Sequence, residues 1–551
     1  MIIKNISLQN FRSYSDDEFT LTFSPNINTL IGENNVGKTT ILEALKKILN
    51  IESLKWDPED FFARDTGRII KISIECILDD DQIKSLISIL GLIYNDSEFK
   101  KYFSNQLIYS YTRMPGKNDI ILKIGFLQIE NGIGFLEGPF ERAKSFPGVP
   151  WENIRDQIAK NKLEHPKSII ERLFEDVKKQ NPNSILSITF PTDIQKAIID
   201  HVSHKIIILE EFREKPQTTL NDLSASPSGR DLASVLYHLK NGEFESREKY
   251  DQIQKKFNDL FPHLTIEITV LKGQYNIEIQ KDRIASTTNF IGSGIIQTLF
   301  LLTHTIAHSD KVLLIDTPEI QLHPHVQRRL GRLLQSTQGS QIILITHSPY
   351  YLPITKESRL IRFVQKDGKT RAICPEENYF TKSDYNIYDQ ILTIDNKEFF
   401  FSRFVVLVEG MSDQWVMQIF TSAEGFDLDE HGISVVSVNG IQNFKRYPKI
   451  LEGYQIPWII MADTDKKREI VKILDIVKKE YPSAQIFLLP GEIEDLLNPE
   501  FMREGGKLFG NGNNKKDKPL KARYAAKKMV EKGMPVPEAI KQVIEELKKR
   551  L

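Results

Sequence analysis

The segment GENNVGKTT at residues 32–40 constrains this chain more than any other part of the sequence. It fits the pattern G-x-x-x-x-G-K-[ST] and lies between an apolar run, INTLI, and a segment with helical spacing, KTTILEALKKIL. Glycines in such a loop let backbone amides surround phosphate groups, and the start of the following helix adds a favourable dipole. The spacing predicts a phosphate-binding loop between a buried strand and a helix, and therefore an α/β nucleotide-binding domain.

The residues of this loop have separate expected roles. Lys38 is expected to reach the β- and γ-phosphates of a nucleotide, and the hydroxyl of Thr39 to complete the shell of a Mg²⁺ ion. We therefore expect ATP and Mg²⁺ as cofactors. Further contacts with the nucleotide are expected from Asn34, Asn35, Gly37 and Thr40.

The length and the order of strand-like and helix-like segments predict three regions, because 551 residues are too many for one core. Residues 1–80 and 201–375 are expected to form one α/β domain in two segments. Between them, residues 81–200 are expected to be a mainly helical insertion, interrupted by the strand-like DIILKIGFLQI. Over residues 400–551 strands alternate regularly with helices, which predicts a parallel sheet with both faces covered.

Several classes of protein are excluded by composition. No apolar run approaches the ~20 residues of a membrane span, and the first residues, MIIKNISLQNF, lack the apolar centre of a secretory signal. The two cysteines, Cys76 and Cys374, cannot make a disulfide framework or a Cys-based zinc site. We therefore expect a cytoplasmic protein that does not contact a membrane.

The C-terminal part is locally basic although the whole chain has a net charge of −1. The basic residues gather in NNKKDKPLKARYAAKK. Such a segment attracts polyanions, although a solvated helix face has the same composition.

A second group of residues lies far from the phosphate loop and is acidic. In VVLVEGMSD, Glu409 ends an apolar run, and Asp413 follows four residues later, on the same face of the first helical turn. In PWIIMADTD, Asp463 and Asp465 follow another apolar run, and residues two apart on an extended segment point to one face. If the two runs are parallel strands, these carboxylates converge at one edge of the sheet.

Converging carboxylates predict a metal site. They raise one another's pKa unless cations neutralise them, and oxygen ligands suit Mg²⁺ or Mn²⁺. Such ions can activate a water molecule and stabilise the leaving oxygen of a phosphodiester. The sequence therefore predicts a second metal site, distinct from the nucleotide site.

The N-terminal half resembles the SMC- and RecF-like branch of the ABC-type ATPases, through LQNFRSY and the phosphate loop. NFIGSGIIQTLFLL is similar to the ABC signature, with Ser293, Gly294 and Gln297 facing a partner's nucleotide. VLLIDTPEIQLHP is similar to the Walker B segment, in which Asp316 would hold the Mg²⁺-bound water. ILITHSP is similar to the switch strand, with His347 near the γ-phosphate. The resemblance implies ATP held between two subunits.

One position departs from that family pattern. A glutamate usually follows the Walker B aspartate and acts as general base, but here the position is Thr317, which cannot accept a proton at neutral pH. Glu319, two residues later, is the candidate substitute. We therefore expect ATP binding, with slow or conditional hydrolysis.

The C-terminal half resembles Toprim, a metal-dependent domain, through EGMSD, MADTD and Gly440 after the second strand. GEIEDLL is similar to the later acids of one Toprim nuclease family, with Glu494 as the best match. In that family a lysine beyond these acids stabilises charge on the scissile phosphate. Lys518 in KDKPLKA is the first candidate for this role and Lys521 the second.

An ABC-type ATPase followed by Toprim resembles the OLD (overcoming lysogenization defect) nucleases, and is similar to Gabija-type and retron-associated nucleases. The resemblance implies an ATP-regulated DNA endonuclease of anti-phage defence with Mg²⁺ or Mn²⁺ at both sites. It implies a homodimer through the ATPase and insertion region, or a tetramer, and a helicase or a retron reverse transcriptase as partner. The alternative is a RecF/SMC-like ATP-dependent DNA-binding repair module without nuclease activity. The expected metal ligands or base are Glu409, Asp413, Asp463, Asp465 and Glu494.

Overall fold

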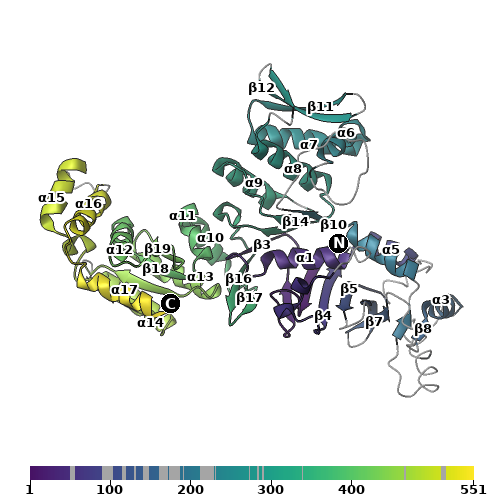
Figure 1. Ribbon diagram of the computed structural model, residues 1–551, viewed down its shortest axis with the longest axis horizontal. Helices are drawn as coiled ribbons and strands as arrows, with labels where there is room; N and C mark the ends of the chain where they lie inside the picture. Colours follow the sequence, from purple (N-terminus) through teal and green to yellow (C-terminus); the bar gives the residue numbers. More distant parts are fainter. Residues whose placement is uncertain are drawn as a thin grey trace. The chain divides into compact units, whose positions relative to one another are not determined.

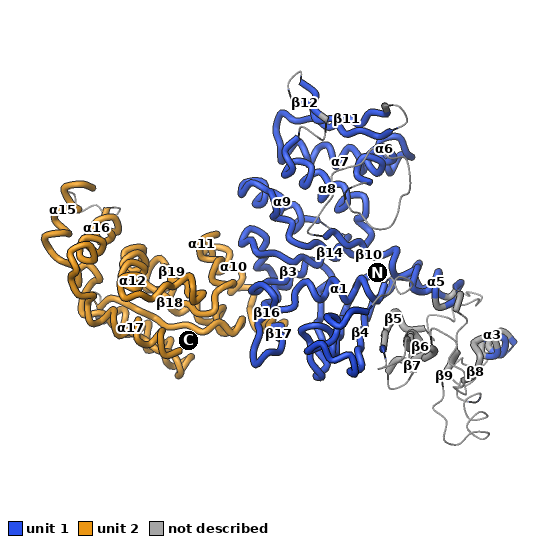
Figure 2. The backbone as a smooth tube through the Cα atoms, viewed as in Figure 1, with its two compact units in different colours: residues 1–372 blue, residues 373–551 orange. Residues whose placement is uncertain are grey.

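The computed structural model divides the chain into two compact units, residues 1–372 and 373–551 (Figure 2). The division lies close to the predicted end of the first domain at 375, and the second unit also includes residues 373–399. The structure describes residues 1–49, 56–89, 103–113, 120–129, 132–139, 148–160, 172, 187–189, 192–210, 229, 231–271, 274–281, 284–287, 291–337, 339–464, 467–509 and 517–550.

The first unit is built on a six-stranded sheet in the order β10-β14-β15-β3-β16-β17 (Figure 1). The first five of these strands are parallel. Every residue of β3, β14 and β15 is buried, as expected of inner strands covered on both faces. The strands are β3 (Ile27–Gly32), β10 (Ile206–Leu209), β14 (Val312–Asp316), β15 (Gln341–Ile345), β16 (Arg359–Lys366) and β17 (Lys369–Ile373).

A second sheet of this unit corrects the prediction of a mainly helical insertion. Its order is β2-β1-β4-β5-β6-β7, and all its pairs are antiparallel. Strands β5, β6 and β7 come from the insertion, and β5 pairs along the free edge of β4. The strand-like segment DIILKIGFLQI was predicted and forms β6, but local patterning missed β5 and β7 because their backbone hydrogen bonds depend on segments elsewhere in the sequence. The strands are β1 (Ile2–Gln9), β2 (Phe19–Thr22), β4 (Ile70–Ile77), β5 (Phe103–Arg113), β6 (Ile120–Ile129) and β7 (Gly132–Pro139).

The described remainder of the insertion is short. It consists of helices α2 (Asp80–Ile89), α3 (Trp151–Lys160) and α5 (Thr192–Ser203), with the paired strands β8 (Gly148–Pro150) and β9 (Ser187–Thr189).

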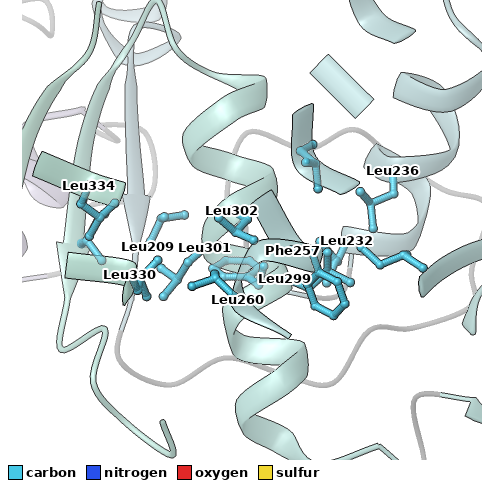
Figure 3. Packing of buried hydrophobic residues seen from close by; sticks show 14 of the residues in the cluster. Leu209, Leu232, Leu236, Phe257, Leu260, Leu299, Leu301, Leu302, Leu330 and Leu334 are labelled. Carbon is cyan, nitrogen blue, oxygen red and sulfur yellow. The ribbon is translucent and has the colours of Figure 1, made fainter. Parts of the chain in front are cut away.

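Helices and a small antiparallel sheet complete the first unit around one apolar core. Figure 3 shows leucines of α6, α8 and α9 meeting Phe257 and Leu260 of α7. These residues are buried together with strand residues of the central sheet such as Leu209. The elements are α1 (Lys38–Leu49), α6 (Leu232–Asn241), α7 (Phe244–Leu260), β11 (Leu264–Leu271), β12 (Gln274–Lys281), β13 (Ile284–Thr287), α8 (Ser293–Ala307) and α9 (Pro324–Ser336).

The second unit confirms the predicted parallel sheet. Its order is β19-β18-β20-β21, and all three pairs are parallel. The strands are β18 (Phe404–Val408), β19 (Ile433–Ser437), β20 (Trp458–Ala462) and β21 (Gln485–Leu488). The helices are α10 (Lys382–Ile391), α11 (Ile394–Lys397), α12 (Met411–Ala423), α13 (Tyr447–Gly453), α14 (Lys467–Glu480), α15 (Pro499–Phe509), α16 (Lys518–Glu531) and α17 (Glu538–Arg550).

Small residues bring α16 close to the rest of this unit. Ala522, Ala525 and Ala526 are fully buried in one core with Val416 of α12. Alanines permit a close approach because they have no side chain beyond Cβ to separate the helix axes. Among the described residues, no helix is both long and apolar enough to cross a membrane.

Candidate functional site

The phosphate loop between β3 and α1 forms one wall of a cavity of about 460 Å³. Asp316, at the end of β14, and His347, just after β15, form another part of the wall, as predicted for a nucleotide site. Ser293, Gly294 and Gln297 of α8 do not line it. The lining residues are Arg12, Ser13, Asn34, Asn35, Gly37, Lys38, Thr39, Thr40, Asp316, Thr317, Ile345 and His347.

Lys38 lies at the base of this cavity and is only 5% exposed. Its Nζ donates hydrogen bonds to the carbonyl oxygens of Gly32 at 2.9 Å and Glu33 at 2.5 Å. Burial lowers the pKa of Lys38 to about 8, although the charges of Asp316 and Glu33 act in the opposite direction. A buried ammonium bound mainly to carbonyl oxygens gains from a nearby anion, so the residues fit a phosphate group.

The loop has a fixed backbone shape. Gly37 has φ of +98°, and a Cβ atom there would lie 2.6 Å from Ser13 Oγ. The hydroxyl of Tyr14 donates to the Gly37 carbonyl at 3.0 Å, and that of Thr370 donates to the Val36 carbonyl at 3.0 Å. Gly37 is therefore required both for its conformation and for the space around it.

Thr317 takes the place of the usual general base. It lines the cavity, has φ of +41°, and its N–H donates to the Ile345 carbonyl at 2.9 Å. A β-branched residue is seldom found in this left-handed region. Its hydroxyl cannot act as a base at neutral pH, so its position next to Asp316 supports the expectation of slow hydrolysis.

Glu319, the candidate substitute for the base, contacts the segment that follows β15. Its carboxylate accepts hydrogen bonds from the Thr346 hydroxyl at 2.9 Å and from the backbone N–H of His347 at 2.6 Å. It does not line the cavity. Glu319 therefore anchors the segment that presents His347. Burial, together with the positive charge of Lys38, lowers the pKa of His347, which favours the neutral imidazole.

The predicted carboxylates meet in the second unit. Glu409 follows β18, Asp413 lies in the first turn of α12, and Asp463 follows β20. Glu494 lies in a short helical turn, Ile493–Leu496, after β21. Because these strands are parallel neighbours, the loops that follow them lie at the same edge of the sheet. Asp465 is outside the described residues.

These carboxylates are close enough to change one another's ionisation. Asp413 is 4% exposed and Asp463 is 8% exposed. Burial, together with the charges of Glu494 and Glu409, raises the pKa of Asp413 to about 7. Burial and the charges of Asp413, Glu494 and Glu409 raise the pKa of Asp463 to about 8. Crowded acids of this kind are stabilised by a cation between them.

Three carboxylate oxygens in this cluster are buried without a hydrogen-bond partner: Asp413 Oδ1, Asp463 Oδ1 and Glu494 Oε1. The other oxygen of Asp413 accepts a hydrogen bond from the N–H of Gly410 at 2.8 Å. A buried oxygen without a partner lowers the stability of the fold unless it binds a ligand. Carboxylate oxygens are the ligands that suit Mg²⁺ or Mn²⁺. Among the described residues, no group of three acidic, histidine or cysteine side chains is already arranged to hold a metal ion. The oxygens fit a divalent ion, and binding one requires them to draw together.

Lys518, the first candidate for the catalytic lysine, lies at this cluster. Its Nζ forms ion pairs with Glu492 at 2.8 Å and Glu494 at 3.3 Å. Burial alone would lower its pKa, but the hydrogen bond with Glu492 and the charge of Glu494 raise the pKa above the usual lysine value. It therefore remains protonated at neutral pH.

Two further residues shape the cluster. Gly440 has φ of +113°, and its N–H donates to the Glu409 carbonyl at 3.2 Å, which ties the loop after β19 to the end of β18. Thr464 was not predicted. Its N–H donates to the Gly491 carbonyl at 3.0 Å and its hydroxyl to the Leu489 carbonyl at 2.8 Å. The only feature of the sequence that could have pointed to Thr464 is its position between the two aspartates of MADTD.

Without metal, the stability of the protein should fall as pH rises. The folded-state pKa values of Asp413 and Asp463 are raised from 3.8 to about 7 and about 8. The folded state therefore binds more protons than the unfolded state between these values, and stability present at low pH is lost as pH rises through the folded pKa. We expect the melting temperature in EDTA to fall between about pH 5 and 8, and added Mg²⁺ to reduce this slope. If Asp463→Asn left the dependence of the melting temperature on pH unchanged, the raised pKa of Asp463 would not be its cause.

Comparison with known proteins identifies two domains in the chain. The family described as AAA ATPase domain matches residues 1–352, and the family described as overcoming lysogenization defect protein-like, TOPRIM domain, matches residues 400–465. The endonuclease GajA of Bacillus cereus is 24% identical over 85% of this chain and 75% of its own length. The OLD nuclease of Thermus scotoductus is 21% identical over 99% of this chain and 98% of its own. The uncharacterized protein MJ1542 of Methanocaldococcus jannaschii is 27% identical, over 46% of this chain and 32% of its own length.

Proposed function

Because the chain belongs to the AAA ATPase domain family and carries an OLD-like Toprim domain, we propose that it is an ATP-regulated, divalent-metal-dependent DNA endonuclease. The observation that carries this proposal is the group of three buried, unpartnered carboxylate oxygens beside Lys518. Relatives named OLD nuclease and endonuclease GajA, which align with most of this chain, support it.

The residues divide the chemistry among themselves. Glu409, Asp413, Asp463 and Glu494 would hold one or two Mg²⁺ or Mn²⁺ ions, with Asp465 as a further candidate ligand. A divalent ion bound there supplies an activated water and stabilises the leaving oxygen of a phosphodiester. Lys518 exchanges its ion pair with Glu492 for the scissile phosphate and offsets the charge that develops on it.

The nucleotide site has a regulatory role in this proposal. Lys38 and the loop hold the phosphates of ATP, with Thr39 and Asp316 on its Mg²⁺, and Thr317 keeps turnover slow. Glu319 positions His347, so that the switch segment responds to the γ-phosphate. Ser293, Gly294 and Gln297 act on the nucleotide of a second subunit, which fits their absence from the cavity of their own chain.

The wider role proposed is anti-phage defence by a homodimer or tetramer that cuts DNA. Assembly would occur through the ATPase domain and the insertion. The defence-system partner would be a helicase or a retron reverse transcriptase. GajA and the OLD nucleases are the relatives that support this assignment.

The test is cleavage of supercoiled plasmid in Mg²⁺ or Mn²⁺, with and without ATP. The wild-type chain should nick or linearise the plasmid only when the metal is present, and Glu409→Ala and Asp463→Ala should each remove this activity. Cleavage that survives both substitutions would overturn the assignment. A wild-type chain that binds DNA but never cuts it would favour a repair module without nuclease activity.

A further inference from the structure

Helix α16 carries excess positive charge beside the carboxylate cluster. Its sequence, KPLKARYAAKKMVE, contains five basic residues and one acidic residue. Lys518 is paired with acids of the cluster, and Lys528 is paired with Glu531. Arg523 and Lys527 are exposed. Within the described residues, neither of these two side chains forms an ion pair with a carboxylate.

Arg523 stacks on an aromatic ring of the neighbouring helix instead. Its guanidinium carbon lies 5.0 Å from the centre of the Trp415 ring of α12. Stacking of this kind restricts the guanidinium plane and leaves its N–H donors available. A planar fork of free donors matches the oxygens of a phosphate group.

The stacked pair lies close to the carboxylate cluster. Helix α12 begins at Met411, two residues after Glu409, and Trp415 is one turn further along. On α16, Arg523 follows Lys518 by five residues, a rise of about 7.5 Å along the helix, and Lys518 is paired with Glu492 and Glu494 of the cluster.

We propose that Arg523, held in place by Trp415, binds a backbone phosphate of the cleaved DNA strand close to the scissile phosphate. Arg523 is then a positioning residue that sets the register of the strand over the carboxylate cluster. Lys527, four residues further along the same face of α16, continues the path for the strand. This inference rests on the proposed nuclease function.

The test is Arg523→Ala in the full-length chain. Binding of a short DNA duplex is measured over a range of salt concentrations, with Ca²⁺ in place of Mg²⁺. Loss of one phosphate contact should weaken binding about tenfold and reduce the slope of log K against log salt by about one. In Mg²⁺, KM for cleavage should rise while kcat at saturating DNA stays unchanged, because Arg523 does not touch the reacting atoms.

The chain provides a matched control in Arg550 of α17. Its guanidinium carbon lies 5.8 Å from the centre of the Phe404 ring, and its Nε is paired with Glu546 at 2.7 Å. Arg550→Ala therefore removes a stacked arginine whose charge is already compensated, and it should leave DNA binding unchanged. Arg523→Lys keeps the charge but loses the planar fork, so it should retain the wild-type salt slope with an intermediate affinity.

The outcomes separate this inference from the proposed function. If Arg523→Ala binds DNA with the wild-type affinity and salt slope, the positioning role is wrong. An equal loss in Arg550→Ala would also overturn it, since the effect would then not belong to this surface. If the wild-type chain neither binds nor cuts DNA, the proposed function itself fails.

Discussion

Asp413→Asn is expected to abolish DNA cleavage and to make the metal-free protein more stable. Asparagine keeps the hydrogen bond from the Gly410 N–H but removes the charge of a buried group whose pKa is raised to about 7. Above pH 8, the loss of this repulsion should stabilise the metal-free fold by on the order of 1–3 kcal/mol. Loss of a metal ligand should lower the cleavage rate by about a thousandfold or more.

Plasmid cleavage and thermal unfolding in EDTA and in Mg²⁺ test both parts of this prediction. The matched control is Asp475→Asn, because Asp475 is an exposed aspartate on α14 in the same unit. It should change neither activity nor the stabilisation by metal. If Asp413→Asn destabilised the metal-free protein, or cut DNA at the wild-type rate, the carboxylates would not be a metal site under mutual repulsion.

Thr317→Glu is expected to raise the rate of ATP hydrolysis by about tenfold to a hundredfold, because a positioned general base contributes about 10²–10⁴. Thr317 lines the nucleotide cavity and follows Asp316 directly, so a carboxylate there can reach an attacking water. The backbone at this position has φ of +41°. An unbranched glutamate is no more strained in that conformation than the β-branched threonine it replaces.

Phosphate release from ATP in the full-length chain measures this effect. Thr317→Gln is the control, since glutamine has nearly the same size but cannot accept the proton. Glu319→Gln should alter ATP affinity through the segment of His347 rather than supply or remove a base. Brisk hydrolysis by the wild type that none of these substitutions changes would show that the chain uses another base.

The sequence was sufficient to predict the parts of the fold that are encoded locally. Apolar runs such as VLLID and FVVLV became inner parallel strands, with Asp316 as the last residue of the first strand and Glu409 directly after the second. The position of a residue just after a parallel strand fixes where it lies, so the carboxylate cluster could be foreseen before any distance was known.

Contacts between distant segments could not be predicted in the same way. Strand β5 forms its backbone hydrogen bonds with β4, which no local pattern encodes. The ion pair of Lys518 with Glu492 joins the first residue of α16 to the loop after β21, and the two residues are 26 positions apart in the sequence. The hydrogen bonds that Glu319 accepts from the Thr346 hydroxyl and the His347 N–H could not be predicted either, because these partners follow a different strand, β15.

The central claim is that the carboxylate cluster binds the metal that cuts DNA. The most direct measurement counts bound Mn²⁺ by electron paramagnetic resonance in the absence of ATP, while plasmid cleavage is followed in the same samples. The wild type should bind Mn²⁺ in proportion to its cleavage activity, and Asp413→Asn should lose both together. Cleavage without bound Mn²⁺, or full Mn²⁺ binding by Asp413→Asn, would contradict the claim.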